Sequence, residues 1–236
     1  MKNYLLRKKN GTQLTLSMLL AAMEGITIIF GCYLTLFLKP FRDRWGLSKE
    51  ETKRSFPGDE FVEEPKSQFT HAIKINASAQ QVWPWIAQIG QGRGGFYSYE
   101  ALEELAGLHI RNADEILPEF QNPQLGDLIP FGQGEAYPLI VCEKDKAMAI
   151  GHCRDLDRNE AYDPEVQKSE NNFQVSWLWY VEPLDEQHSR FISRNRVTYT
   201  SSFKNKLLFG LLAEPVIFAM DRKMCYGIKR RAEATL

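Results

Sequence analysis

The longest apolar stretch of the chain lies near the N-terminus and runs from Leu14 to Leu38 with one charged residue, Glu24. At about 1.5 Å per residue, a helix of this length exceeds the roughly 30 Å hydrocarbon core of a bilayer. We therefore expect a basic N-terminus over residues 1–13 and a single transmembrane helix over residues 14–38. The stretch is too long for a cleaved signal peptide, whose apolar region spans about 7 to 15 residues. A helix buried in the folded domain is the alternative, and Glu24 favours it because an intramembrane carboxylate costs free energy.

Residues 39–67 are mostly polar and are interrupted by Pro57-Gly58 and Pro65, which is typical of a juxtamembrane linker. The folded domain is expected over residues 68–236. Alternation of apolar and polar residues over 71–76 predicts a strand, and Ser78 with Gln81 forms a capping box at the start of a helix. A second helix is expected from Ser98 to a stop at Gly107.

Beyond this second helix the period of the pattern changes from helical to two. Short apolar runs at 128–131, 139–143 and 147–152 predict an antiparallel meander. Over 173–181 the odd positions are apolar and share one face of a strand. Another strand is expected over 191–200. Its Arg194 and Arg196 face either the hollow or water, and solvent is the default expectation.

Apolar residues at helical spacing over 209–228 predict one long amphipathic C-terminal helix, bent at Pro215. The order of these elements predicts an α+β fold in which a curved antiparallel sheet wraps around the C-terminal helix. A curved sheet and a straight helix cannot touch everywhere, so we expect an apolar hollow between them.

Composition narrows the function classes. Acidic and basic residues nearly cancel, to a formal net charge of −1, which argues against a nucleic-acid partner. The four cysteines lie far apart without a C-x-x-C pair, and neither a metal nor a cofactor is predicted. Lys and Arg flank both ends of the apolar stretch, so a single-pass membrane protein is expected without a preferred orientation.

The segment from Val82 to Tyr99, VWPWIAQIGQGRGGFYSY, resembles a signature of a bacterial group within the SRPBCC superfamily, the START-like and polyketide cyclase/dehydrase-like helix-grip proteins. Residues 56–60, 112–114, 116–119 and 220–229 agree with the same group in order. The resemblance covers about residues 45–236. It implies the helix-grip fold and a cavity that carries a hydrophobic, lipid-like or polyketide-like small molecule between the sheet and the C-terminal helix. The fold hosts many functions, so a cyclase/dehydratase-type enzyme and a membrane-tethered interaction module without ligand are the alternatives.

Aromatic residues of the signature and of the alternating strand are the candidates for the core or the ligand site. The predicted ligand-binding residues are Trp83, Trp85, Arg93, Phe96, Tyr97, Tyr99, Trp177, Trp179 and Met220. Arg93 is proposed to hold an anionic head group, with a structural salt bridge in its loop as the alternative. His109 and Asp114 are the candidates for a catalytic acid and base, and Asp114 equally suits a turn. The catalytic role predicts that His109 or Asp114 points into the hollow.

Overall fold

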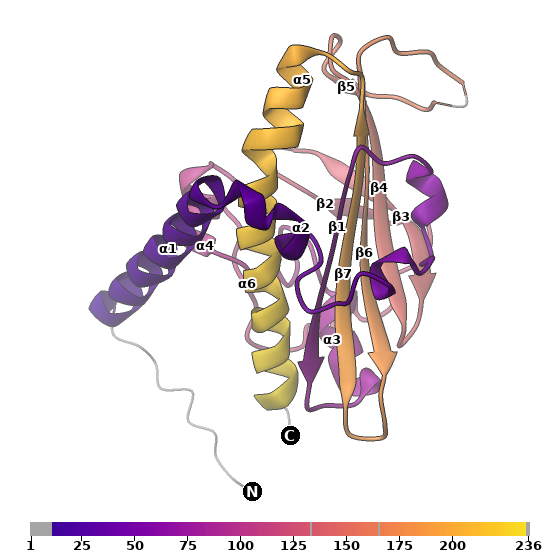
Figure 1. The fold of residues 1–236 in the computed structure, drawn as a ribbon. Helices are drawn as coiled ribbons and strands as arrows, with labels where there is room; N and C mark the ends of the chain where they lie inside the picture. Colours follow the sequence, from indigo (N-terminus) through magenta and orange to yellow (C-terminus); the bar gives the residue numbers. More distant parts are fainter. Residues whose placement is uncertain (1–10, 133, 165, 235–236) are drawn as a thin grey trace, which may run out of the picture.

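One antiparallel sheet forms the body of the molecule, and a long C-terminal helix crosses its concave face (Figure 1). The computed structural model describes residues 11–132, 134–164 and 166–234. The strand order is β1-β7-β6-β4-β3-β2, with β5 paired to β4. The strands are β1 (Ser67–Ile75), β2 (Leu128–Pro130), β3 (Ala136–Glu143), β4 (Ala147–Asp155), β5 (Glu160–Ala161), β6 (Asn172–Pro183) and β7 (Ser189–Tyr199).

The helices follow the order expected from the sequence. They are α1 (Gly11–Leu34), α2 (Lys39–Arg42), α3 (Ala79–Ala87), α4 (Glu100–Leu105), α5 (Phe203–Leu207) and α6 (Ala213–Ala234), with short 3-10 turns at Leu36–Leu38, Glu51–Lys53, Asp59–Val62 and Pro118–Phe120. The capping box of Ser78 and Gln81 is present at the start of α3. After α4 the backbone turns at Gly107, whose φ of 74° favours glycine.

A π-helical segment, Leu208–Leu212, joins α5 to α6 and makes one continuous C-terminal helix. The sequence places a bend at Pro215, and the structure places the irregularity in the turn before it. Pro215 has no N–H to donate, and its ring crowds the carbonyl of the preceding turn. A wider π turn at that point removes the conflict.

Strand β6 presents its odd-numbered residues to the C-terminal helix, as its alternation predicts. Trp179 and Val181 are fully buried between the sheet, α3 and α6. The even-numbered neighbour Leu178 belongs to a separate apolar cluster on the outer face. The predicted fold class is therefore confirmed: an α+β helix-grip arrangement with an apolar helix at its N-terminus.

Part of the segment predicted as a linker covers the outer face of the sheet. Phe56 is buried there, and Asp59 forms an ion pair of 3.0 Å with Arg194. Arg196 donates to the carbonyl of Val62 at 2.9 Å. The expectation that Arg194 and Arg196 face solvent was wrong: they are 4% and 9% exposed because this segment lies over them.

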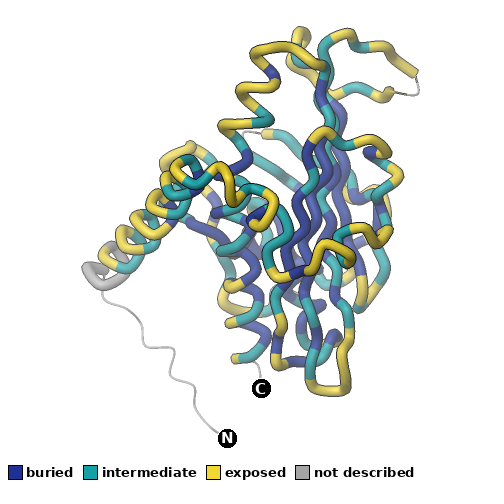
Figure 2. Tube along the Cα trace, viewed as in Figure 1, coloured by how far each residue is buried: buried dark blue, intermediate teal, exposed yellow. Residues whose placement is uncertain are grey.

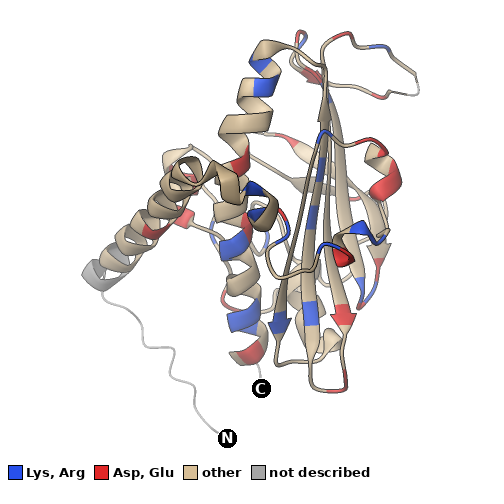
Figure 3. Cartoon of the chain, in the orientation of Figure 1, with Lys and Arg blue, Asp and Glu red and all other residues tan. Residues whose placement is uncertain are grey.

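Helix α1 leans away from the sheet and meets the domain along α4 and α6 (Figure 1). The only charged residue of α1, Glu24, is 2.8 Å from Lys223 and 3.7 Å from Arg222, both on α6 (Figure 3). Tyr33 donates to the carbonyl of Leu212 at 2.7 Å. By length and composition, Leu16–Leu34 could cross a membrane, and its outward side is exposed and apolar (Figure 2).

Candidate ligand-binding cavity

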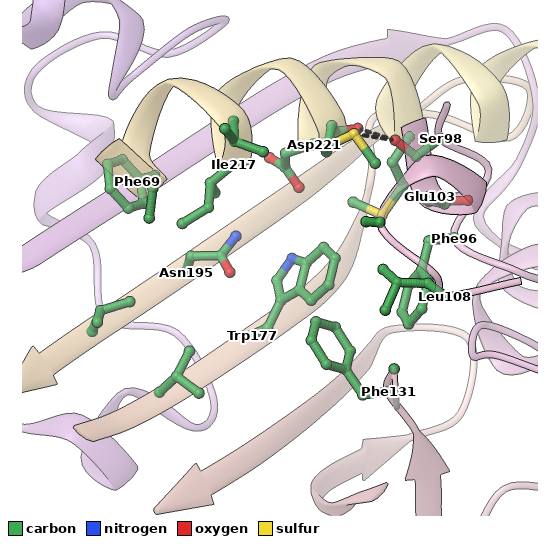
Figure 4. Close-up of a pocket in the computed structure, with 18 of the residues that line it drawn as sticks. Phe69, Phe96, Ser98, Glu103, Leu108, Phe131, Trp177, Asn195, Ile217 and Asp221 are labelled. Atoms are coloured by element: carbon green, nitrogen blue, oxygen red, sulfur yellow. Dashed lines mark hydrogen bonds between the residues drawn. The ribbon is translucent and has the colours of Figure 1, made fainter. Parts of the chain in front are cut away.

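A cavity of about 690 Å³ lies between the concave face of the sheet and the C-terminal helix (Figure 4). The sheet supplies apolar side chains such as Val175 and Trp177 on β6. Helix α6 supplies Ile217 and Met220 from the opposite side. Ligand pockets usually occupy about 300–1,000 Å³ and have mainly apolar walls. The cavity therefore has the size and lining of a site for an apolar small molecule.

Helices α1 and α4 close one side of this cavity. Ile29 of α1 and Leu102 of α4 both belong to its wall. The two helices pack closely at Gly25, because a Cβ atom there would lie 2.7 Å from Leu102 Cδ1 and 3.2 Å from the ring of Tyr99. By contrast, a Cβ atom at Gly31 would meet nothing within 4 Å. Contact between α1 and α4 thus depends on the missing side chain at Gly25.

One polar network reaches the cavity from α6. Asp221 lines the cavity and accepts hydrogen bonds from Ser193 Oγ at 2.6 Å and from His71 Nδ1. Trp177 Nε1 in turn donates to Ser193 Oγ at 2.9 Å. His71 and Ser193 are fully buried. The network fixes the Asp221 carboxylate at the wall, because buried hydrogen-bonded groups have few alternative partners.

Two further polar side chains in the wall have buried atoms without partners in the described part of the chain. Asn195 on β7 is 7% exposed, and its Nδ2 donates no hydrogen bond there. Glu103 on α4 is 3% exposed, and its Oε2 accepts none. Burial, assisted by the nearby Glu100, raises the pKa of Glu103 to about 7. Such groups cost free energy unless something pairs with them.

A second polar group lies at the β3 end of the cavity. Glu135 forms an ion pair with Arg154 and accepts from Tyr137 Oη at 3.3 Å. The ring of Tyr137 stacks on His152, with centroids 4.1 Å apart. Burial raises the pKa of Tyr137 and lowers that of His152. The Glu135 carboxylate is therefore already paired with other residues of the protein.

Three of the predicted ligand-binding residues lie in the cavity wall: Phe96, Trp177 and Met220. The rings of Phe96 and Trp177 stack with centroids 5.7 Å apart. The Met220 carbonyl accepts a hydrogen bond of 3.0 Å from Ser98 Oγ. These contacts link the loop after α3, strand β6 and helix α6 around one space.

The other predicted ligand-binding residues lie behind or beside the wall. Trp83, Trp85, Tyr97 and Trp179 are buried in the main core. Tyr99 is buried near α1, with Lys223 over its ring at 4.7 Å.

Arg93 is used inside the loop between α3 and α4. It donates to the Ala87 carbonyl at 2.9 Å and stacks over Phe120. Burial lowers the pKa of Arg93, with Asp127 opposing this effect. The side chain therefore ties the glycine-rich loop to α3 and does not line the cavity.

His109 and Asp114 are both exposed and lie outside the cavity wall. The His109 side chain is 73% exposed and is bonded to Glu104 at 2.9 Å. The Asp114 side chain is 69% exposed and pairs with Arg231 at 2.7 Å. The catalytic proposal required at least one of them to face the hollow, so these positions give it no support.

The residues predicted for the site do not include Asn195, Asp221, His71 or Glu103. The alternation of β7 could have indicated Asn195. Phe191, four residues earlier, is buried and apolar and lies on the same face of the strand. Asp221 follows Ile217 by four residues on the apolar side of the last helix, where a carboxylate is unexpected. Among the residues the structure describes, no group of three or more His, Cys, Asp or Glu side chains is placed to hold a metal ion.

Comparison with known proteins gives similarity of structure only. No protein-family model and no curated protein matches the chain. Among solved structures, the Zhui aromatase/cyclase from Streptomyces sp. R1128 is 12% identical with a TM-score of 0.31, over 71% of this chain and 93% of that one. A polyketide-cyclase-like protein from Corynebacterium glutamicum is 16% identical with a TM-score of 0.32, over 73% and 95%. A norcoclaurine synthase from Thalictrum flavum is 13% identical with a TM-score of 0.31, over 69% and 93%.

Proposed function

We propose that the protein binds a hydrophobic small molecule, lipid-like or polyketide-like, in the cavity between the sheet and α6, and does so at a membrane. The observation that carries this proposal is the cavity itself, about 690 Å³ with largely apolar walls. An empty apolar space of this kind forfeits packing energy, so an occupant would stabilise the fold. An interaction module without ligand would instead have a side-chain-filled interior.

Uptake of pyrene, an apolar hydrocarbon, by the full chain in amphipol tests the proposal. Energy transfer from Trp177 and the other tryptophans to pyrene reports binding. The variant Val175→Phe fills part of the cavity, since Val175 lines it; Leu184→Phe, at an exposed position, is the matched control. We expect saturable transfer in the wild type and in the control, and weaker binding, seen as a higher half-saturation concentration, in Val175→Phe. Equal signals from all three proteins would indicate partition into the amphipol and would contradict the proposal.

Membrane attachment is assigned to α1, whose outward side is apolar and exposed. Two placements are considered: α1 crosses the bilayer once, or it lies along the surface. The ion pairs of Glu24 with Lys223 and Arg222 support the surface placement for the docked helix, because crossing with these contacts intact would take basic residues of α6 into hydrocarbon. Labelling of Leu16→Cys from each side of sealed vesicles separates the two placements. A reagent on the side opposite the folded domain should label it only if α1 crosses the bilayer, and a reagent on the domain's own side only if α1 lies along the surface.

A cyclase- or dehydratase-type activity is the second candidate, and Glu103 is the observation that favours it. A wall carboxyl group with a pKa of about 7 can both give and take a proton near neutral pH. Incubation of an extracted ligand with wild type and with Glu103→Gln tests this activity. A product lighter by one water, formed only by the wild type, would support it.

A further inference from the structure

The charged side chains of the cavity wall all have the same sign. Glu103, Glu135 and Asp221 line the cavity, and within the described residues no Lys, Arg or His does. An anionic ligand needs a cation or several aligned donors, and an apolar cavity strengthens repulsion between like charges. The charges of the wall therefore disfavour binding of a ligand whose polar end is a carboxylate or a phosphate.

Most polar groups of the wall already have protein partners. Ser67 donates to Glu214 at 2.9 Å, and Ser98 donates to the Met220 carbonyl. Glu135 is paired with Arg154. These groups need nothing from a ligand, which leaves Glu103 on α4 and the part of the wall formed by β7 and α6. Of these, only the second part offers an unpaired donor within the described residues, on Asn195, together with a carboxylate, on Asp221.

Asn195 and Asp221 face the cavity there from opposite sides, with Trp177 beside them (Figure 4). Asn195 Nδ2 is a buried donor without an acceptor in the described part of the chain. The Asp221 carboxylate accepts from Ser193 and His71 and keeps lone pairs for a further donor. The site thus offers a donor on Asn195 together with an acceptor on Asp221, which a hydroxyl group can satisfy together because it both accepts and donates.

We infer that the cavity selects a neutral apolar alcohol, whose hydroxyl group accepts a hydrogen bond from Asn195 and donates one to Asp221, and that it discriminates against fatty acids and other anionic lipids. This inference rests on the proposed function, because it concerns the polar end of the ligand that the cavity would hold. Trp177 and Ser193 are positioning residues in this account, since they orient Asp221 through the bonds described above.

A matched pair of fluorescent probes, 1-pyrenebutanol and 1-pyrenebutyrate, tests the inference in the full chain. They share an apolar body, and at about pH 8 only the second carries a charge. Binding is measured by tryptophan-to-pyrene energy transfer, and the part of the signal that does not saturate with probe concentration is subtracted as partition. We expect the alcohol to bind at least about tenfold more tightly than the acid, which corresponds to about 1.4 kcal/mol.

Two variants assign the effect to the named residues. Asn195→Leu conserves volume and removes the unpaired donor, so it should lower the affinity for the alcohol about fivefold to tenfold relative to the affinity of the same variant for pyrene. Asp221→Asn should bring the acid closer to the alcohol in affinity. Comparable affinities for alcohol and acid, or an alcohol affinity in Asn195→Leu that is unchanged relative to pyrene, would overturn the inference while leaving the proposed function intact. Failure of pyrene itself to bind would instead overturn the proposed function.

Discussion

Replacement of Glu103 by glutamine should make the protein more stable at alkaline pH and leave its stability at acidic pH nearly unchanged. The Glu103 side chain is almost fully buried in the cavity wall, and one carboxyl oxygen has no partner among the described residues. Glutamine has nearly the same shape and cannot ionise. The variant therefore imitates the protonated form of the wild-type side chain at every pH.

The magnitude follows from the pKa of Glu103, which burial raises from 4.5 to about 7. A raised carboxyl pKa means that the folded state holds its proton more tightly than the unfolded state. The favourable contribution is fully present below about pH 4.5 and is lost as the pH rises through about 7. One pKa unit is about 1.4 kcal/mol, so the wild type loses about 3 kcal/mol over this window relative to the variant.

Thermal unfolding of the full chain in amphipol, followed by tryptophan fluorescence at about pH 4.5 and about pH 8, measures this difference. For a chain of this size, about 3 kcal/mol corresponds to a Tm difference of roughly 6–12 °C at the higher pH. Glu119→Gln, at an exposed position, controls for the exchange of carboxyl for amide. A variant that gains no stability between the two pH values, or that loses it, would show that Glu103 is not buried as described.

Three further predictions test how the elements of the fold pack together. Gly25→Leu should separate α1 from α4, whereas Gly31→Leu should not, because a Cβ atom at Gly31 meets nothing within 4 Å; protease cleavage between α1 and the domain should accelerate in the first variant alone. Asp59→Ala should cost about 3 kcal/mol in denaturant unfolding, since it leaves Arg194 buried without its carboxylate, and a loss below about 1 kcal/mol would contradict that role. Trp179→Leu should cost about 3 kcal/mol through the void it leaves in the main core, and an unchanged midpoint would refute its packing.

Local sequence patterns were enough to predict the main helices and strands and the side of β6 that faces the C-terminal helix. The alternation around Trp179 predicted which side of β6 faces the helix, because side-chain direction in a strand depends only on the parity of the position. The capping box at Ser78 is likewise a contact between residues three positions apart. Such features need no knowledge of the rest of the chain.

Long-range contacts escaped prediction because no local pattern encodes them. Alternation placed Arg194 on the outer face of β7, but its burial depends on Asp59, far away in the sequence. The partner of Glu24 is Lys223, 199 positions along the chain. Asn195 and Asp221 face one cavity only because the sheet curves around α6. Aromatic residues such as Trp83 were predicted to bind the ligand because they are large and apolar. The same property suits them equally well to the core beside the cavity, where Trp83 lies.

Native mass spectrometry of the full chain, released from a mild detergent, would show whether the cavity holds a ligand. We expect a peak at the 27.2 kDa of the chain, accompanied by one that carries the added mass of an apolar molecule, which collisional activation removes. The variant Val175→Phe, which narrows the cavity, should show a smaller fraction of the ligand-bound peak, and Leu184→Phe should behave as the wild type. Identical bare spectra for all three proteins, together with no uptake of pyrene, would contradict a ligand-binding role for the cavity.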